Sequence, residues 1–350
     1  MKHIKVALLF GGASNEYAIS LRSAAAVLRH LDEKYEPILI GITQNGSWYL
    51  FRGEIDAIEQ DTWWQNPSLL SALDLSLEVQ GGFKTERNER ILPDVIIPVL
   101  HGQNCEDGRL QGLLDLSGIP YVGCGCAASA FGMDKAVTKI IAQAYGVPVA
   151  AWLLFTREEL DSDLGEAINR TEKRFNDYPV FVKAVNSGSS VGAYRADDRD
   201  SLRRALLDAA KVDDKILVEE FIRGKEVETA VFSTAKGVTA FDPGEVEPCA
   251  DFYDYDTKYK NDTANYYIPA RLTAEQLATV KDYAVRVFRA IGGRHLSRVD
   301  FFATDDGRII FNEINTLPGF TSISMYPKMA EAGGLSFTQL VNALIEEALS

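Results

Sequence analysis

The stretch Ser297-Arg-Val-Asp-Phe-Phe-Ala-Thr-Asp-Asp-Gly-Arg-Ile-Ile-Phe-Asn-Glu-Ile-Asn315 decides the fold of the chain. Residues 297–302 and 308–312 are rich in β-branched and aromatic side chains, which are typical of strands. The turn Asp305-Asp-Gly307 separates them, so the stretch predicts a β-hairpin. The apolar residues of both strands predict that one face of the sheet is buried.

The polar residues of this hairpin predict a metal site. Alternate residues of a strand face the same side, so Arg298 and Asp300 point together, as do Glu313 and Asn315. Two carboxylates and an amide oxygen on one face are hard oxygen ligands suited to Mg²⁺ shared with substrate phosphates. The alternative is a solvated polar face on an edge strand, which the apolar flanking residues disfavour.

The rest of the chain predicts an α/β protein of three units. A chain of 350 residues exceeds the usual domain size of roughly 100–150 residues. Its first part alternates strand-like residues 5–10, 36–42 and 94–100 with a helical pattern over 19–31, as in a parallel sheet flanked by helices. We expect units over residues 1–123, 124–215 and 216–350, with a helix over 135–145 and a strand over 178–183.

One segment of the third unit predicts a lid. Residues 245–268 have neither helical nor strand periodicity, and stretches of this length inside a domain are usually functional lids or disordered. Several aromatic residues between Phe252 and Tyr267 argue against disorder.

Composition excludes several classes of protein. The net charge of −14 argues against non-specific nucleic-acid binding, because phosphate backbones attract basic surfaces. The apolar runs fall short of the roughly 20 residues of a membrane helix, and the first residues lack the pattern of a signal peptide, so we expect a cytoplasmic protein. The four cysteines are too few and too irregularly spaced for a disulfide framework, and we expect buried free thiols.

A glycine- and serine-rich turn, Asn186-Ser-Gly-Ser-Ser-Val-Gly192, follows the strand over 178–183. Glycines let successive backbone N–H groups converge on an anion, and the hydroxyls of Ser189 and Ser190 add donors. The turn therefore suggests a phosphate-binding loop, although short turns of this kind are common and no Gly-Lys-Ser/Thr follows it.

Four other positions carry reactive or binding groups. After a Pro-Gly turn the N–H of Gly319 is free to face an oxyanion, and Ser324 could donate to a carboxylate. Glu16 follows a strand and could hold an ammonium, unless it is an ordinary acid of a first helical turn. His101, at the end of another strand, could donate to reacting oxygens, or it could be structural.

In this order the segments resemble the D-alanine–D-alanine ligase family of the ATP-grasp superfamily over essentially the whole chain. The resemblance rests on Phe10-Gly-Gly-x-Ser-x-Glu16 with Ser20, His101-Gly102 with Glu106-Asp-Gly108 and Leu110-Gln-Gly112, Met133-Asp-Lys135, Phe181-Val-Lys183, Gly188-Ser-Ser-Val-Gly192, Phe252-Tyr-Asp-Tyr-Asp-Thr-Lys-Tyr259, Arg298-Val-Asp300, Asn312-Glu-Ile-Asn315 and Pro318-Gly-Phe-Thr321. It implies a three-domain ATP-grasp architecture whose N-terminal domain has a Rossmann-like parallel sheet.

The resemblance also implies a nucleotide site between the second and third domains. The ATP-binding residues would be Lys135, Lys183, Ser190, Glu219, Glu220, Phe221, Ile222, Glu226 and Lys258. In that arrangement the lysines lie at the phosphates, residues 219–222 at the adenine and Glu226 at the ribose. Asp300, Glu313 and Asn315 would hold Mg²⁺ or Mn²⁺.

Substrate residues follow from the resemblance in the same way. Glu16, with the hydroxyls of Ser189 and Tyr259, would bind the ammonium of a first D-alanine. Lys258 and Ser324 would take the carboxylate of a second one. His101, Arg298 and the Gly319 N–H would face the reacting oxygens.

The implied activity is ATP-dependent ligation of two D-alanines through an acyl phosphate, for peptidoglycan precursor synthesis, by a cytoplasmic homodimer.

Tyr17, which stands where most relatives have histidine, leaves a D-alanine–D-serine ligase of the vancomycin-resistance type as an alternative. Met325 opposes it, because those enzymes carry arginine there. Ala184, in place of the usual proline, is a further departure. A non-catalytic binding protein is disfavoured because every acid, amide, lysine and arginine position is filled, and another carboxylate–amine ligase is disfavoured by the lid and Glu16.

Overall fold

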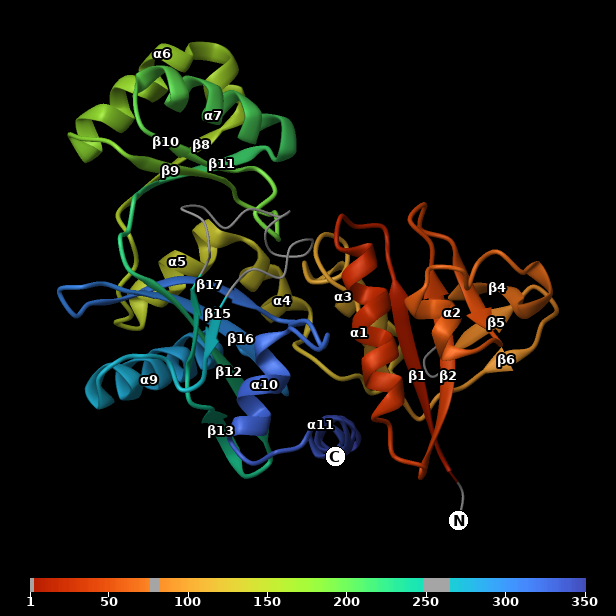
Figure 1. The fold of residues 1–350 in the computed structure, drawn as a ribbon. Helices are drawn as coiled ribbons and strands as arrows, with labels where there is room; N and C mark the ends of the chain where they lie inside the picture. Colours follow the sequence, from red (N-terminus) through yellow and green to blue (C-terminus); the bar gives the residue numbers. More distant parts are fainter. Residues whose placement is uncertain (1–2, 76–81, 248–264) are drawn as a thin grey trace.

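The computed structural model describes residues 3–75, 82–247 and 265–350. These residues form three sheets flanked by helices (Figure 1). Most of the predicted lid, with Lys258 and Tyr259, lies outside the described residues. Within the described ranges, no helix has both the length and the apolar character needed to span a bilayer.

The first sheet has seven strands in the order β6-β5-β4-β3-β2-β1-β7. They are β1 (Ile4–Gly11), β2 (Tyr35–Ile42), β3 (Trp48–Phe51), β4 (Leu70–Leu75), β5 (Phe83–Thr85), β6 (Arg90–Ile91) and β7 (Val95–Pro98). The predicted parallel pairing holds for β1 with β2 and β7, whereas β3 to β6 extend the sheet in antiparallel fashion. The short connection between β2 and β3 permits only antiparallel pairing, because a parallel crossover needs a dozen or more residues.

Five helical segments belong to this part of the molecule. They are α1 (Tyr17–Arg29), α2 (Ile55–Glu59), the 3₁₀ turn η1 (Pro67–Leu69), α3 (Arg109–Ser117) and α11 (Phe337–Leu349). Helix α11 comes from the end of the chain, yet Val341 and Leu344 share a hydrophobic core with Val27 and Ile97. Figure 1 shows it between α10 and α1. The last helix of the predicted third unit thus packs on the first sheet.

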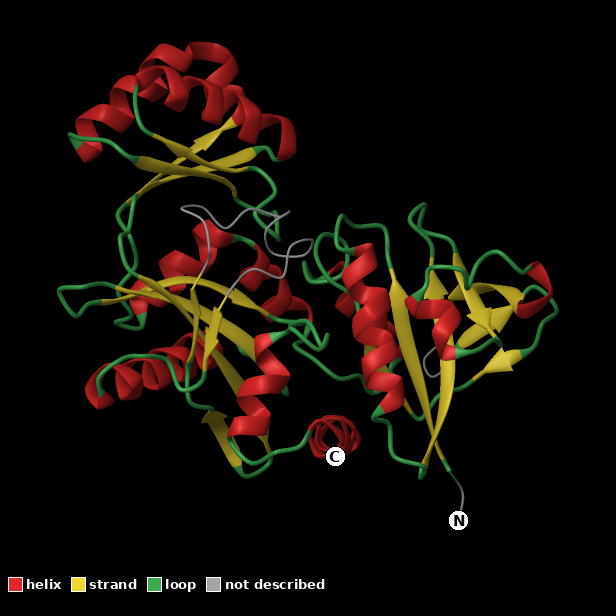
Figure 2. Ribbon diagram, in the orientation of Figure 1, coloured by secondary structure: helices red, strands yellow, loops and turns green. Residues whose placement is uncertain are grey.

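The second sheet has four strands in the order β10-β9-β11-β8, all antiparallel. They are β8 (Trp152–Thr156), β9 (Val180–Ala184), β10 (Ala193–Ala196) and β11 (Lys215–Glu220), and the helices are α6 (Arg157–Phe175) and α7 (Arg199–Val212). Figure 2 shows both helices on one face, which leaves the other face toward the third sheet. We expected β11 to open the third unit, but it pairs with β8 and β9. The boundary at 215/216 stays a prediction.

The third sheet has the order β15-β14-β12-β16-β17, with β13 paired to β12. Its strands are β12 (Lys225–Thr234), β13 (Gly237–Ala240), β14 (Gly244–Glu247), β15 (Asn265–Tyr267), β16 (Leu296–Ala303) and β17 (Ile309–Asn315). The helices around it are α4 (Cys126–Met133), α5 (Lys135–Ala144), α9 (Ala274–Ala290) and α10 (Met325–Ala332). One face is buried by α4, α5 and α9 around Phe288, Phe301 and Phe311.

The pairing of β16 with β17 confirms the predicted hairpin. Its register places Arg298 opposite Asn315 and Asp300 opposite Glu313. Beyond Asp300 the register shifts, and Asn312 has no partner across the ladder. Such bulges re-aim a side chain, and here the amide of Asn312 reaches the lysine of a neighbouring sheet, as described below.

The cysteines match the expectation in part. Cys105 and Cys124 are buried free thiols, whereas Cys126 is exposed at the start of α4. Cys249 lies outside the described residues.

The packing of α11 leads to a stability prediction. Leu344→Ala should lower the free energy of unfolding by about 2–5 kcal/mol, because the side chain is buried and its removal leaves a cavity. Leu207→Ala on α7, where the leucine is 41% exposed, serves as the control and should stay within about 0.5 kcal/mol of the parent. Denaturant unfolding measures both, and equal losses would contradict the packing of α11 on the first sheet.

Candidate active site

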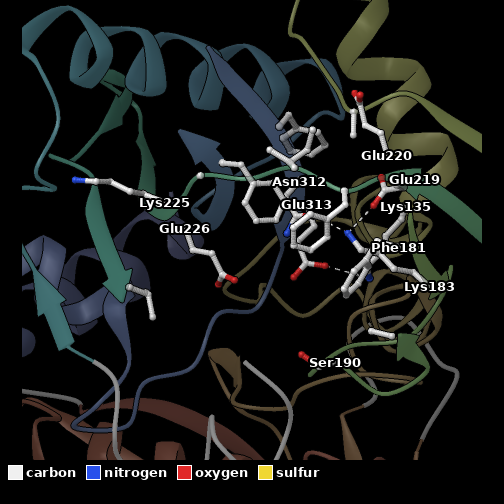
Figure 3. Close-up of a pocket in the computed structure, with 18 of the residues that line it drawn as sticks. Lys135, Phe181, Lys183, Ser190, Glu219, Glu220, Lys225, Glu226, Asn312 and Glu313 are labelled. Atoms are coloured by element: carbon white, nitrogen blue, oxygen red, sulfur yellow. Dashed lines mark hydrogen bonds and ion pairs between the residues drawn. The ribbon is translucent and has the colours of Figure 1, made fainter. Parts of the chain in front are cut away.

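A cleft of about 480 Å³ lies between the second and third sheets (Figure 3). The expected nucleotide residues among those described all line it: Lys135, Lys183, Ser190, Glu219, Glu220, Phe221, Ile222 and Glu226. Apolar walls come from Phe181, Phe302 and Phe311. Glu226 projects into the cleft from β12, and the lysines reach it from α5 and β9 (Figure 3).

A buried ion cluster forms one wall of this cleft. Glu219 is 3% exposed, and its two carboxylate oxygens lie 2.5 Å from the Lys139 Nζ and 2.6 Å from the Lys183 Nζ. Burial raises the pKa of this carboxyl, but the two ammonium groups outweigh it and hold the pKa at about 2. Lys183 also donates to the Asn312 Oδ1 at 2.9 Å. We expected Glu219 at the adenine; here its carboxylate also fixes the position of Lys183.

Sequence reasoning missed Lys139, which is 1% exposed. Helix α5 begins where the Asp134 carboxylate accepts the Val137 N–H at 2.9 Å, which caps the helix. Lys139 follows Lys135 by one helical turn and therefore lies on the same face. This four-residue spacing could have indicated that Lys139 also faces the cleft, but a second lysine on a helix is usually solvated.

Lys135 connects the glycine- and serine-rich loop to the third sheet. Its Nζ donates to the Ser187 carbonyl at 2.7 Å and lies 3.1 Å from a Glu313 carboxylate oxygen. Ser189 and Ser190 have φ of 51° and 60°, a left-handed conformation that residues other than glycine rarely adopt. Strained backbone of this kind persists mostly at functional sites, which favours the phosphate-binding reading of the loop.

A smaller cavity of about 110 Å³ adjoins the cleft. Its lining includes the expected catalytic residues among those described, namely Glu16, His101, Ser189, Arg298, Gly319 and Ser324. Ser189 and Glu313 line both cavities, so the two spaces meet at these side chains. Tyr259 and Lys258 stay predictions because they lie outside the described residues.

Arg298 stands at the centre of the charges in the smaller cavity. Its guanidinium donates to both Asp300 carboxylate oxygens, at 2.8 and 2.7 Å, and lies 3.0 Å from Glu228. Burial opposes the charge, but these carboxylates raise the pKa of Arg298 well above its usual value. Sequence reasoning missed Glu228, although strand alternation puts it on the same face as Glu226.

The expected metal ligands meet on the face of the hairpin. Asp300 lies opposite Glu313 in the register, and the Asn315 amide donates to Asp300 at 3.1 Å. Among the described residues, no group of three or more histidine, cysteine, aspartate or glutamate side chains could hold a metal ion. The expected set has two carboxylates and one amide, so a cation there needs further oxygens from phosphates or water, which is usual for Mg²⁺.

Two glycines make room for the Glu16 carboxylate. The Ser189 hydroxyl donates to Glu16, which stands at the start of α1. A Cβ added to Gly102 would lie 2.4 Å from a Glu16 carboxylate oxygen, and one added to Gly188 would lie 3.0 Å from it. Both loops therefore approach this carboxylate closely, and a side chain at Gly102 would force the carboxylate to move.

Tyr17 turns away from both cavities. Its hydroxyl donates to Asp61 at 2.9 Å and accepts from the Trp63 indole at 3.0 Å, within the core of the first sheet. Burial raises the pKa of this phenol above its usual range. Tyr17 therefore lines neither cavity, whereas Met325 lines the smaller one.

His101 and Ser324 are both engaged within the protein. The His101 Nδ1 lies 2.9 Å from the Leu317 carbonyl, and its Nε2 lies 3.3 Å from the Ser23 hydroxyl. Burial lowers the pKa of this imidazole, so the ring stays neutral. The Ser324 hydroxyl accepts from the Thr321 N–H at 3.0 Å. Direct contact of either side chain with a substrate stays a prediction.

The chain matches two models of one protein family. Residues 5–124 match the model described as D-ala D-ala ligase N-terminus, and residues 141–346 match D-ala D-ala ligase C-terminus. Similar proteins include a D-alanine–D-alanine ligase of Ruminiclostridium cellulolyticum, 45% identical over 99% of this chain and 96% of the relative. One of Acetivibrio thermocellus is 42% identical with the same coverage.

Solved structures agree with these matches. The VanG D-Ala:D-Ser ligase from Enterococcus faecalis superposes with a TM-score of 0.90 at 38% identity, over 99% of this chain and all of that one. The D-alanine–D-alanine ligase from Coxiella burnetii gives a TM-score of 0.86 at 32% identity, over 99% and 95%. These likenesses confirm the predicted α/β, three-domain ATP-grasp architecture.

The buried cluster gives a prediction for Lys139→Met. With one ammonium removed, Glu219 draws Lys183 more strongly, and we expect the KM for ATP to rise about tenfold, or roughly 1.4 kcal/mol. The loss of one partner of a buried ion pair should also lower stability by up to roughly 3–5 kcal/mol. Steady-state kinetics and thermal unfolding measure the two effects.

The same variant should unfold at a higher pH on acid titration. The Glu219 carboxyl, whose pKa falls from 4.5 to about 2 on folding, stabilises the folded state above pH 4.5, and this contribution is lost as the pH falls toward 2. Without Lys139 the pKa of Glu219 is lowered less, so this stabilisation is smaller and is lost at a higher pH. Lys211→Met, at an exposed surface pair, is the control. A normal KM and an unchanged acid transition in Lys139→Met would contradict this role of the cluster.

Proposed function

The chain belongs to the D-alanine–D-alanine ligase family, and we propose that it uses ATP to join two D-alanines into D-alanyl-D-alanine for peptidoglycan synthesis. The observation that best supports this proposal is that the larger cleft and the smaller polar cavity meet at Ser189 and Glu313, beside Arg298. The alternative D-alanine–D-serine ligase is not favoured, since relatives 42–45% identical over the full length are D-alanine–D-alanine ligases.

The first step has to overcome repulsion between two anions. A carboxylate is a poor acyl donor, so the carboxylate of the first D-alanine attacks the γ-phosphorus of ATP, and ADP leaves with formation of an acyl phosphate. Lys135 and Lys183 supply positive charge at the cleft. Hydrogen bonds to Ser187 and Asn312 and the ion pair with Glu219 hold both ammonium groups in place before the nucleotide binds.

The hairpin fits a divalent cation at the same place. Asp300 and Glu313 lie opposite each other, and the Asn315 amide donates a hydrogen bond to Asp300. These oxygens suit Mg²⁺ or Mn²⁺, which when bound would neutralise charge on the transferring phosphoryl group. Arg298 and Lys135 hold the two carboxylates in position.

The second step forms the peptide bond. The amine of the second D-alanine attacks the acyl carbon, the amine releases a proton, and phosphate leaves. Arg298 and Gly319 line the smaller cavity, and a guanidinium and a backbone N–H are suited to stabilise the tetrahedral oxyanion. One such donor is typically worth roughly 3–4 kcal/mol.

Glu16 and Ser189 are suited to orient the first D-alanine. A carboxylate within hydrogen-bond reach of a hydroxyl, in a space kept open by Gly102 and Gly188, matches a small ammonium group. Closure by residues 245–268 would keep water from the acyl phosphate. We further propose that the protein is cytoplasmic and that it forms a homodimer. Analytical ultracentrifugation would test the homodimer.

Product analysis tests the proposed activity directly. With ATP, Mg²⁺ and D-alanine, we expect equal amounts of ADP, phosphate and D-alanyl-D-alanine. Parallel mixtures that add D-serine or D-lactate should still give mainly D-alanyl-D-alanine. Absence of dipeptide in every mixture would refute the ligase, and a preferred mixed product would overturn the assigned second substrate.

Glu313→Gln tests the acid that both cavities share. We expect kcat to fall at least about 100-fold with the fold intact, because a charged oxygen at the transferring group is lost. Circular dichroism checks the fold, and Glu275→Gln on the exposed face of α9 is the matched control. Near-normal turnover of Glu313→Gln would exclude this residue as a ligand of the cation.

A further inference from the structure

Three side chains near the first sheet hold the backbone of the loop that carries Gly319. The Leu317 N–H donates to the Glu106 Oε1 at 3.0 Å, and the His101 Nδ1 lies 2.9 Å from the Leu317 carbonyl. The Phe320 N–H donates to the Ser23 hydroxyl at 3.1 Å. Gly319 lies between these two anchored residues, so its N–H is fixed from both sides.

Glu106 is anchored at its other end as well. Its second carboxylate oxygen accepts the Gly102 N–H at 2.8 Å, so one carboxylate joins the 101–106 loop to Leu317, which is 211 residues away. The residue is 9% exposed, and burial together with the nearby charge of Glu16 raises the pKa of Glu106 above its usual value, whereas the two backbone N–H groups lower it. Burial of this group is therefore costly, and the two backbone N–H donors offset part of that cost.

The same network fixes the tautomer of His101. A carbonyl oxygen only accepts, so the ring proton is on Nδ1, which donates to Leu317. The Nε2 atom is then an acceptor for the Ser23 hydroxyl, and the oxygen of Ser23 remains able to accept the Phe320 N–H. Each member of the network thus has a donor or acceptor role that its partners match.

We propose that Glu106 is a positioning residue for the ligation step: through the backbone of Leu317 it fixes the Gly319 N–H at the wall of the smaller cavity. The proposal rests on the proposed function, because it concerns the oxyanion of the second step. Glu106 and Gly319 both line that cavity. Neither Glu106 nor Ser23 lines the nucleotide cleft, so nucleotide binding should be independent of them.

This role predicts different effects on the two steps, acyl phosphate formation and dipeptide formation. Displacement of the Gly319 N–H weakens stabilisation of the tetrahedral oxyanion, and shifts of about 1 Å can cost roughly 100-fold in rate. The groups that serve phosphoryl transfer, Lys135 and Lys183, keep their own partners. Loss of Glu106 should therefore slow dipeptide formation more than acyl phosphate formation.

Glu106→Gln is the informative change, because the amide keeps the size of the side chain but offers one acceptor oxygen. Either the Gly102 or the Leu317 N–H then faces an NH₂ group. We expect kcat for dipeptide formation to fall about 10- to 100-fold, with the KM for ATP within about twofold of the wild-type value. Exchange of bridging and non-bridging oxygens within labelled ATP, which reports reversible acyl phosphate formation, should rise relative to net turnover.

Two further variants complete the experiment. Glu36→Gln makes the same substitution at an exposed site on β2 and should behave as wild type. Ser23→Ala removes the acceptor of the Phe320 N–H and should repeat the pattern of Glu106→Gln; it decides the matter if Glu106→Gln does not fold. Wild-type rates in the folded variants, or a parallel fall of isotope exchange and turnover, would overturn the proposal. Failure of the wild-type enzyme to form dipeptide would instead contradict the proposed function.

Discussion

A guanidinium that is largely removed from water needs carboxylate partners, and the side chain of Arg298, which is 22% exposed, has them in the third sheet. Arg298 on β16 binds both oxygens of Asp300 on its own strand and lies 3.0 Å from Glu228 on β12. A buried charge without a partner costs several kcal/mol, so these strands are held in a register that keeps the partners together. The same register puts Glu313 opposite Asp300 and Asn315 opposite Arg298. The acids, the amide and the guanidinium thus come together where the nucleotide cleft meets the smaller cavity.

The other two parts of the molecule contribute loops to this centre. The second sheet supplies Lys183 and the strained turn with Ser189 and Ser190, and a buried carboxylate holds the lysine in place. The first sheet supplies Glu16, His101 and Glu106 from the loops after β1 and β7, as expected for the carboxyl ends of parallel strands. Each part alone lacks a complete site. Contacts such as Ser189 with Glu16, and Glu106 with Leu317, join these parts at the proposed site.

Short-range patterns predicted what depends on neighbours in sequence. Alternation and an Asp-Gly turn were sufficient for the β16–β17 hairpin and for the shared face of Asp300, Glu313 and Asn315. The bulge at Asn312, the place of β11 in the second sheet and the return of α11 to the first sheet depend on contacts between distant residues, which local patterns do not encode. For the same reason sequence reasoning missed Lys139 and Glu228 and noted Glu106 only as a motif residue beside His101. A lysine on a helix or a glutamate in a strand or loop looks solvated until the fold surrounds it with other side chains. The domain boundaries and the lid residues Lys258 and Tyr259 stay predictions.

A crystal structure with an ATP analogue and Mn²⁺ in place of Mg²⁺ tests most directly whether the charges around Arg298 build the reaction centre. The anomalous signal of manganese locates the cation directly. We expect it between the terminal phosphates and the oxygens of Asp300, Glu313 and Asn315, with Arg298 still bound to Asp300 and facing the smaller cavity. Manganese elsewhere in the cleft, or these three side chains turned away from the phosphates, would contradict the account.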